Sequence, residues 1–227
     1  MLDTVVFVDS SVKEYFTNEM VLVKVNAEKD TLLARRFHVS GYPTAVLVTN
    51  TGEEVDRIVG YAPPDEYLKT IKDYRNGIGT LDDLLTQAGA GPDRELFYKV
   101  ADKYKYRGGD SAAIAWYTKV VEAGEPTDSL SGEARMALAD MHRRAKEYDK
   151  SLATFAAIKN DFGTGRFAEA AGIWTAIVYR AMGDTTAAIN AFEAFISSYP
   201  ESEDVGYAKA QVEKLKNPPP PKTDGSK

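Results

Sequence analysis

Residues 39–49 read VSGYPTAVLVT, and the turn NTG at positions 50–52 separates them from EEVDRIV at positions 53–59. Two β-branched runs joined by Asn-Thr-Gly are typical of an antiparallel hairpin, because glycine accepts turn backbone angles that other residues resist. The proline at position 43 fixes the backbone just before the first run. We therefore expect strands at residues 45–49 and 54–59.

The segments on both sides of this hairpin alternate between helical and strand-like patterns. Capping residues and apolar spacing predict helices at residues 10–16, 30–37 and 63–74. The run MVLVKV at residues 20–25 is apolar enough to predict a buried strand. The order helix, strand, helix, strand, strand, helix predicts an α/β domain.

The loop GYPT, the strand after it, the Gly52 hairpin and Gly60 together resemble thioredoxin-like domains. The resemblance covers residues 1–75 and is closest to the disulfide-interchange branch of that family. It implies that Pro43 is cis, that the backbone of Tyr42 binds extended substrate peptides, and that Thr44 begins the strand behind this loop. The alternative is that the loop only packs against the sheet.

The sequence contains no cysteine, so the chain as written cannot carry out thiol–disulfide exchange. In thioredoxin-like domains a central strand and the redox cysteines precede the position that corresponds to Met1. We therefore expect a truncated or remodelled domain, in which residues 20–25 and 45–49 lack a strand between them. A thiol–disulfide oxidoreductase whose Cys-x-x-Cys lies just upstream of Met1 is the alternative.

Residues 77–92 contain four glycines around a short predicted helix at 80–85, which is typical of a linker. The apolar residues of this helix fit a contact with either neighbouring domain. C-terminal to the linker, small and aromatic residues recur at spacings of 38 and then 37 residues. The three recurring positions are Ala101, Ala139 and Ala176; Ala113, Ser151 and Ala188; and Tyr117, Phe155 and Phe192.

These positions resemble those of tetratricopeptide repeats, over residues 93–216. The third unit, from Ala176 to Pro200, is the best match. We expect three helical hairpins and a capping helix at residues 204–216, with an irregular helical bundle as the alternative. The predicted organisation is a truncated thioredoxin-like domain at 1–76, a linker at 77–92, repeats at 93–216 and a disordered proline-rich tail at 217–227.

Tetratricopeptide repeats bind partner proteins or peptides on the concave face formed by the first helix of each hairpin. The resemblance places Lys105, Arg143 and Arg180 in a column on that face, where they would receive the carboxylates of an acidic segment or chain end. The alternative is that Asp102 and Asp140 neutralise two of these cations in helix-surface pairs. The full predicted face comprises Tyr98, Asp102, Lys105, Met136, Asp140, Arg143, Ile173, Ile177 and Arg180.

Composition narrows the function classes further. A net charge of −6 and a pI near 5.1 argue against a nucleic-acid partner. No membrane span, metal site or cofactor is expected, because no apolar run is long enough and His38 and His142 are isolated. As given, the chain fits the cytoplasm, and a signal sequence preceding Met1 would make it periplasmic or secreted. For the chain as given we therefore expect a protein-interaction scaffold, and the alternative is a fragment of a thiol–disulfide oxidoreductase.

Overall fold

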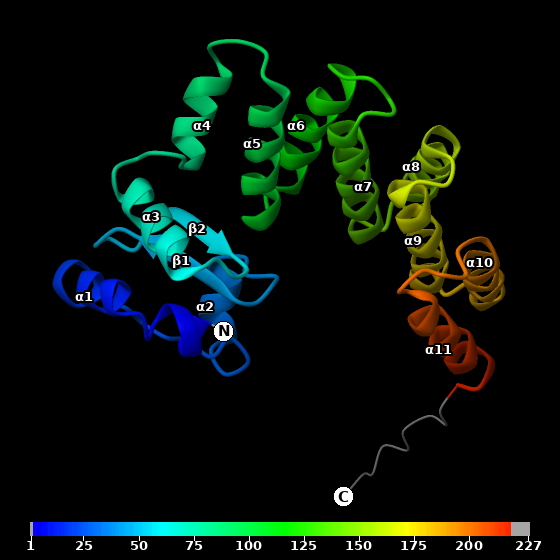
Figure 1. The fold of residues 1–227 in the computed structure, drawn as a ribbon, viewed down its shortest axis with the longest axis horizontal. Helices are drawn as coiled ribbons and strands as arrows, with labels where there is room; N and C mark the ends of the chain where they lie inside the picture. Colours follow the sequence, from blue (N-terminus) through cyan, green and yellow to red (C-terminus); the bar gives the residue numbers. More distant parts are fainter. Residues whose placement is uncertain (1, 219–227) are drawn as a thin grey trace, which may run out of the picture. The chain divides into compact units, whose positions relative to one another are not determined.

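A computed structural model describes residues 2–218 of the chain (Figure 1). The chain divides into two compact units, residues 1–116 and 117–227, and the division falls inside one helix. Most of the predicted proline-rich tail at 217–227 lies outside the described residues. No helix within the described part is both long and apolar enough to cross a membrane.

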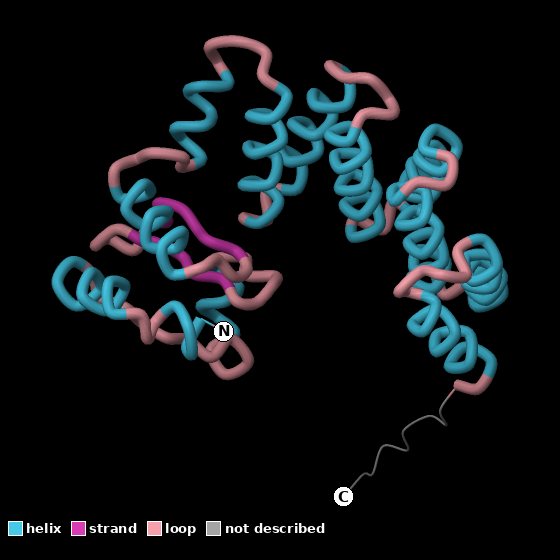
Figure 2. The backbone as a smooth tube through the Cα atoms, in the orientation of Figure 1, coloured by secondary structure: helices cyan, strands magenta, loops and turns pink. Residues whose placement is uncertain are grey.

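The first unit begins with a small α/β arrangement and continues into helices (Figure 2). The predicted helices and the hairpin form close to their expected positions. Its elements are η1 (Leu2–Val6, a π-helix), α1 (Ser10–Glu19), α2 (Thr31–Arg36), β1 (Thr44–Val48), β2 (Glu54–Val59), α3 (Pro64–Arg75), α4 (Leu81–Ala88), α5 (Arg94–Tyr106) and α6 (Asp110–Glu122), which runs past the division.

The hairpin is antiparallel, as the sequence predicts. Its register runs from Thr44 opposite Val59 to Val48 opposite Glu54, with one irregularity near the turn. Gly52 lies in the turn at φ 81°, a conformation that glycine adopts at little cost. The Tyr42–Pro43 peptide bond is cis, which confirms the expectation for this loop.

The predicted strand at residues 20–25 is wrong. These residues form no strand, and Val21 and Val23 are 89% and 70% exposed. A strand exists only where a neighbouring backbone completes its hydrogen bonds, and in the described residues the sheet consists of β1 and β2 alone. The apolar run therefore stays outside the sheet, as expected for a domain that lacks a strand between this run and β1.

A compact hydrophobic core packs against the hairpin. Tyr67, Leu68 and Ile71 of α3 pack against Val6 and Val12, which come from η1 and α1. The short helix α4 docks on α5 through Leu84, so the structure settles a contact that the sequence leaves open. The first unit thus joins the hairpin and its neighbouring helices to α5, the helix predicted to begin the repeats.

The second unit is built from consecutive helices, each packed on the next. Asp128 and Asp184 cap two of them by accepting hydrogen bonds from the backbone N–H groups of Ser131 and Ala187. After the end of α6 its helices are α7 (Ser129–Arg144), α8 (Tyr148–Phe162), α9 (Arg166–Met182), α10 (Thr185–Ser198) and α11 (Val205–Lys216), the predicted capping helix.

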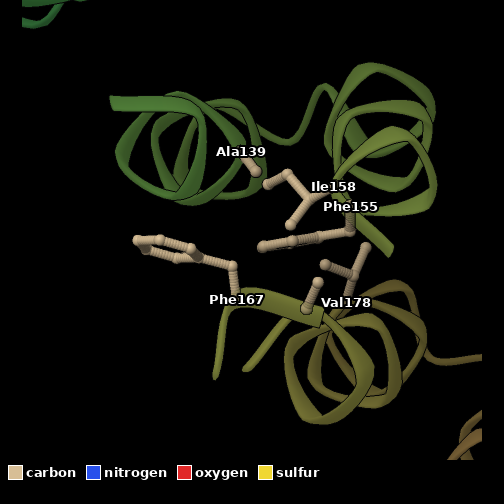
Figure 3. Close-up of a cluster of buried hydrophobic side chains, with 6 residues drawn as sticks. Ala139, Phe155, Ile158, Phe167 and Val178 are labelled. Atoms are coloured by element: carbon tan, nitrogen blue, oxygen red, sulfur yellow. The ribbon is translucent and has the colours of Figure 1, made fainter. Parts of the chain in front are cut away.

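The repeat register is visible in the burial of its side chains. All nine recurring positions have no exposed surface. In the second hairpin the serine at the small-residue position donates a hydrogen bond from Ser151 Oγ to the carbonyl of Ala139, at 2.8 Å, so its hydroxyl is satisfied inside the core. Figure 3 shows Ala139, Phe155, Ile158, Phe167 and Val178 converging from α7, α8 and α9.

Gly132 tests this packing. A Cβ atom at Gly132 in α7 would lie 2.5 Å from the Phe167 ring, which is itself 8% exposed. Gly132→Ala should therefore lower the free energy of unfolding by about 1–3 kcal/mol, although alanine ordinarily favours a helix over glycine. Urea unfolding followed by circular dichroism measures the change.

The matched control is Gly206→Ala in α11, where a Cβ atom meets nothing within 4 Å. We expect this variant to be as stable as the parent protein or slightly more stable. If Gly132→Ala is no less stable than Gly206→Ala, the close approach of α7 and α9 is incorrect.

Candidate functional site

The nine residues of the predicted concave face lie three on each of α5, α7 and α9. The α5 residues Tyr98, Asp102 and Lys105 belong to the first unit, and the other six belong to the second.

In the second unit, side chains connect α7, α9 and α11 across one surface. The guanidinium carbon of Arg143 lies 5.5 Å from the Trp174 ring centroid, which joins α7 to α9. Arg180 donates hydrogen bonds to Tyr207 Oη, at 3.0 Å, and to Gln211 Oε1, which joins α9 to α11. We call this surface the α7–α9–α11 face, defined by Asp140, Arg143, Trp174, Ile177, Arg180, Tyr207 and Gln211.

The three cations of the predicted column have different partners. Lys105 lies 2.6 Å from an Asp102 carboxylate oxygen, and Arg143 lies 2.7 Å from one of Asp140, so both helix-surface pairs form. Arg180 is exposed and bonds to a hydroxyl and an amide oxygen, both neutral. Among the described residues no carboxylate therefore balances the positive charge of Arg180 on the α7–α9–α11 face.

One predicted surface residue is misplaced. Ile173 is only 4% exposed and packs with Phe192 and Phe195 of α10, so it belongs to the core and cannot contact a partner. The side chain of Ile173 lies on the side of α9 that packs against α10. Met136 is half-buried against the neighbouring core, and Ile177 is half-buried at the edge of the α7–α9–α11 face.

The cis-proline loop presents its outer side to solvent. Tyr42 is 69% exposed, and no backbone hydrogen bond joins it to another described residue. The inner side is fixed: Thr44 Oγ1 donates to the Gly41 carbonyl at 2.8 Å, and the Pro43 carbonyl accepts from Gly60 N–H at 2.8 Å. The loop is held by its neighbours while the Tyr42 backbone stays free.

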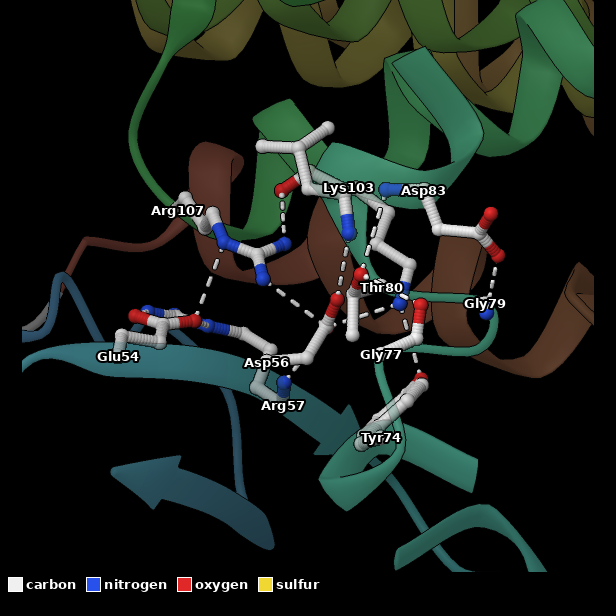
Figure 4. A network of polar contacts seen from close by, with 11 residues as sticks. Glu54, Asp56, Arg57, Tyr74, Gly77, Gly79, Thr80, Asp83, Lys103 and Arg107 are labelled. Atoms are coloured by element: carbon white, nitrogen blue, oxygen red, sulfur yellow. Dashed lines mark hydrogen bonds and ion pairs between the residues drawn. The ribbon is translucent and has the colours of Figure 1, made fainter. Parts of the chain in front are cut away.

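A buried carboxylate on β2 makes several polar contacts within the first unit (Figure 4). Asp56 on β2 has no exposed surface. Its two oxygens accept hydrogen bonds from the backbone N–H groups of Arg57, at 2.7 Å, and Leu81, at 2.8 Å. Asp56 therefore ties the strand to the start of α4.

The same carboxylate also holds α5. Asp56 Oδ1 lies 2.8 Å from Lys103 Nζ and 3.0 Å from an Arg107 guanidinium nitrogen. Glu54 pairs with Arg107 at 3.1 Å and binds Arg57 through both of its oxygens, while Arg57 also donates to the carbonyl of Tyr106. We call these five charged residues, Glu54, Asp56, Arg57, Lys103 and Arg107, the β2–α5 network.

Burial changes the protonation equilibria around this network. Desolvation lowers the pKa of Lys103 even though the Asp56 carboxylate opposes that shift. Burial, reinforced by the negative charge of Asp56, raises the pKa of Tyr74 to about 12. Lys103 Nζ donates to Tyr74 Oη at 2.9 Å, so α3 is joined to the network as well.

A second contact joins the thioredoxin-like elements to the C-terminal end of α5. His38, in the loop before the cis-proline, has φ 49°, and a Cβ atom at Gly108 would lie 2.9 Å from its ring. Gly108 itself has φ 73°, so both its backbone angle and its space require glycine. The turn between α5 and α6 therefore lies directly against the thioredoxin-like loop.

Sequence reasoning missed the β2–α5 network. The available signal was the pair Asp56–Arg57 in the middle of the predicted strand EVDRIV, because charged residues in a strand require partners wherever that strand is buried. The partners themselves lie about 50 positions away along the chain, and no local pattern identifies them.

A two-stranded hairpin with a cis-proline loop, followed by helical hairpins with a recurring buried register, defines a thioredoxin-like domain fused to tetratricopeptide repeats. Comparison with known families agrees: a thioredoxin-like domain is matched at residues 1–75 and a tetratricopeptide repeat at residues 170–202. The second match contains most of the third hairpin, which the sequence marks as the best repeat.

Comparisons with individual proteins add less. No curated protein matches the chain. Among solved structures, the crystal structure of MamA is similar at 20% identity and a TM-score of 0.48, covering 69% of this chain and 90% of that one.

Substitution of Asp56 tests the β2–α5 network. Asp56→Asn keeps the shape of the side chain but leaves Lys103 and Arg107 without their shared counter-charge, so we expect a loss of about 3 kcal/mol in the stability of the first unit. Chemical denaturation at neutral pH measures it.

Asp73→Asn is the control, because Asp73 pairs with Lys69 at 2.6 Å on a partly exposed helix surface. This variant should lose less than about 1 kcal/mol. Equal losses in the two variants would contradict the structural role assigned to Asp56.

Proposed function

We propose that this protein is a non-enzymatic interaction scaffold whose α7–α9–α11 face binds an extended segment of a partner protein. Tetratricopeptide repeats support a role in protein binding. The observation that carries the choice of surface is Arg180, an exposed cation whose two partners on this face are neutral.

The chemistry around Arg180 suits a segment that carries a carboxylate next to an apolar side chain. A carboxylate would pair with the guanidinium, which is geometrically suited to two parallel hydrogen bonds. Ile177 and Tyr207 supply apolar and aromatic surface beside it, and Tyr207 is 39% exposed. Arginine and tyrosine are the residue types that most often dominate binding energy at interfaces.

Arg143 has a different role in this proposal. Its charge is already balanced by Asp140, and its guanidinium lies over Trp174. The pair therefore adds shape and hydrogen-bonding groups but little net attraction for an acidic segment. Specificity for a negative partner depends mainly on Arg180.

The cis-proline loop is a second proposed contact, at Tyr42, Pro43 and Thr44. Its support is the exposed residue Tyr42, whose backbone forms no hydrogen bond to another described residue and could pair with an extended peptide. With no cysteine in the sequence, such a contact would hold a peptide without exchanging disulfides.

Photo-crosslinking tests the proposal. A benzophenone amino acid at position 177 should crosslink a partner protein in an extract of the source cells, and Arg180→Glu should reduce the yield about tenfold or more, because attraction for the carboxylate becomes repulsion.

The control is Lys159→Glu, which makes the same charge change at an exposed position of α8. It should leave the crosslinked product unchanged. A product that is equally abundant in both variants would overturn the assignment of binding to the α7–α9–α11 face.

A further inference from the structure

The first unit contains a cavity of about 480 Å³ between the thioredoxin-like elements and α5. Strand β2 and helix α3 contribute one side and α5 the other, and Asp102, predicted for the concave repeat face, is among the lining residues. The volume falls within the range of small-molecule sites in proteins. Its lining residues precede those of the α7–α9–α11 face in the sequence, and the proposed function assigns no ligand to this cavity.

Five of the six charged residues that line the cavity have a counter-charge. Arg57, Lys103 and Arg107 belong to the β2–α5 network and pair with Glu54 and Asp56. The two lining carboxylates are also neutralised, Asp73 by Lys69 and Asp102 by Lys105, each at 2.6 Å.

Lys99 is different. Its side chain lines the cavity from α5, the residue is exposed, and it has no ion-pair or hydrogen-bond partner among residues 2–218. Lys99 is therefore the charged lining residue that has no ion-pair partner among the described residues, while the other five are paired. A single anionic group is the ligand chemistry that completes this set of pairs.

Apart from Thr70 and Gly79, the uncharged lining residues are apolar or aromatic. Val59, Ile78 and Leu84 line the cavity together with the rings of Tyr74 and Tyr106. Ile78 is 56% exposed and Leu84 is 8% exposed, so apolar surface continues from the opening to the interior. Such a wall gains free energy by covering an apolar body.

We propose that this cavity binds a monocarboxylate with an apolar body, its carboxylate on Lys99 and its body against Ile78 and Leu84. A doubly charged phosphate fits less well, because only one cation is unpaired and the carboxylates of Asp73 and Asp102 lie in the same wall. A free small acid and the C-terminal end of a peptide share the required chemistry.

An NMR titration of the full chain with 3-phenylpropionate tests this site. Saturable shifts are expected at the amides of Ile78, Gly79 and Tyr106, with a dissociation constant of roughly 1 mM for a ligand of this size. The neutral isostere 3-phenylpropionamide and inorganic phosphate should each bind about tenfold more weakly or not at all. The peptide Ac-Ala-Ala-Phe, with a free or an amidated C-terminus, distinguishes a chain end from a free acid as the source.

Lys99→Gln should weaken phenylpropionate binding about tenfold while the protein stays folded, because the residue is exposed and unpaired. Lys209→Gln, at an exposed position of α11, is the matched control and should bind as the parent protein does. Equal binding of acid and amide, unchanged binding by Lys99→Gln, or no saturable shift with either acid or peptide would overturn the proposal.

Discussion

The arrangement of the first unit depends on one buried carboxylate. Asp56 has no exposed surface and is bound by two backbone N–H groups, a lysine and an arginine, which come from β2, the start of α4, and α5 with its C-terminal cap. An unpaired charge at this depth would be strongly unfavourable, so these elements must stay together. Among the described residues the sheet has only β1 and β2, and the β2–α5 network attaches β2 to α5.

The second unit is stabilised in a different way. Its helices recur with small residues where backbones approach and aromatic rings where space must be filled, and every one of these positions is fully buried. Among the recurring small residues the polar one is Ser151, and its hydroxyl donates a hydrogen bond to the Ala139 carbonyl. Each hairpin packs on its neighbour, and this stacking buries the apolar face that a single hairpin would leave open.

The sequence predicted the elements whose signals are local or periodic. The hairpin at Asn50–Gly52 follows from turn chemistry, and the repeat register follows from small and aromatic residues that recur at a regular spacing. The strand at residues 20–25 was wrong because strand formation requires a distant partner, which composition cannot guarantee. Ile173 was misassigned by the repeat register, and the pairing of Asp56 with Lys103 joins residues too far apart for any sequence pattern to connect them.

Native-state hydrogen exchange tests most directly whether the thioredoxin-like hairpin and the first repeat helix form one physical unit. The amides of β2 and of α5 should open with the same free energy and the same dependence on denaturant, because the β2–α5 network joins them into one cooperative unit. If the amides of α5 stay protected at denaturant concentrations where those of β2 have already exchanged, the two elements unfold separately and this account is contradicted.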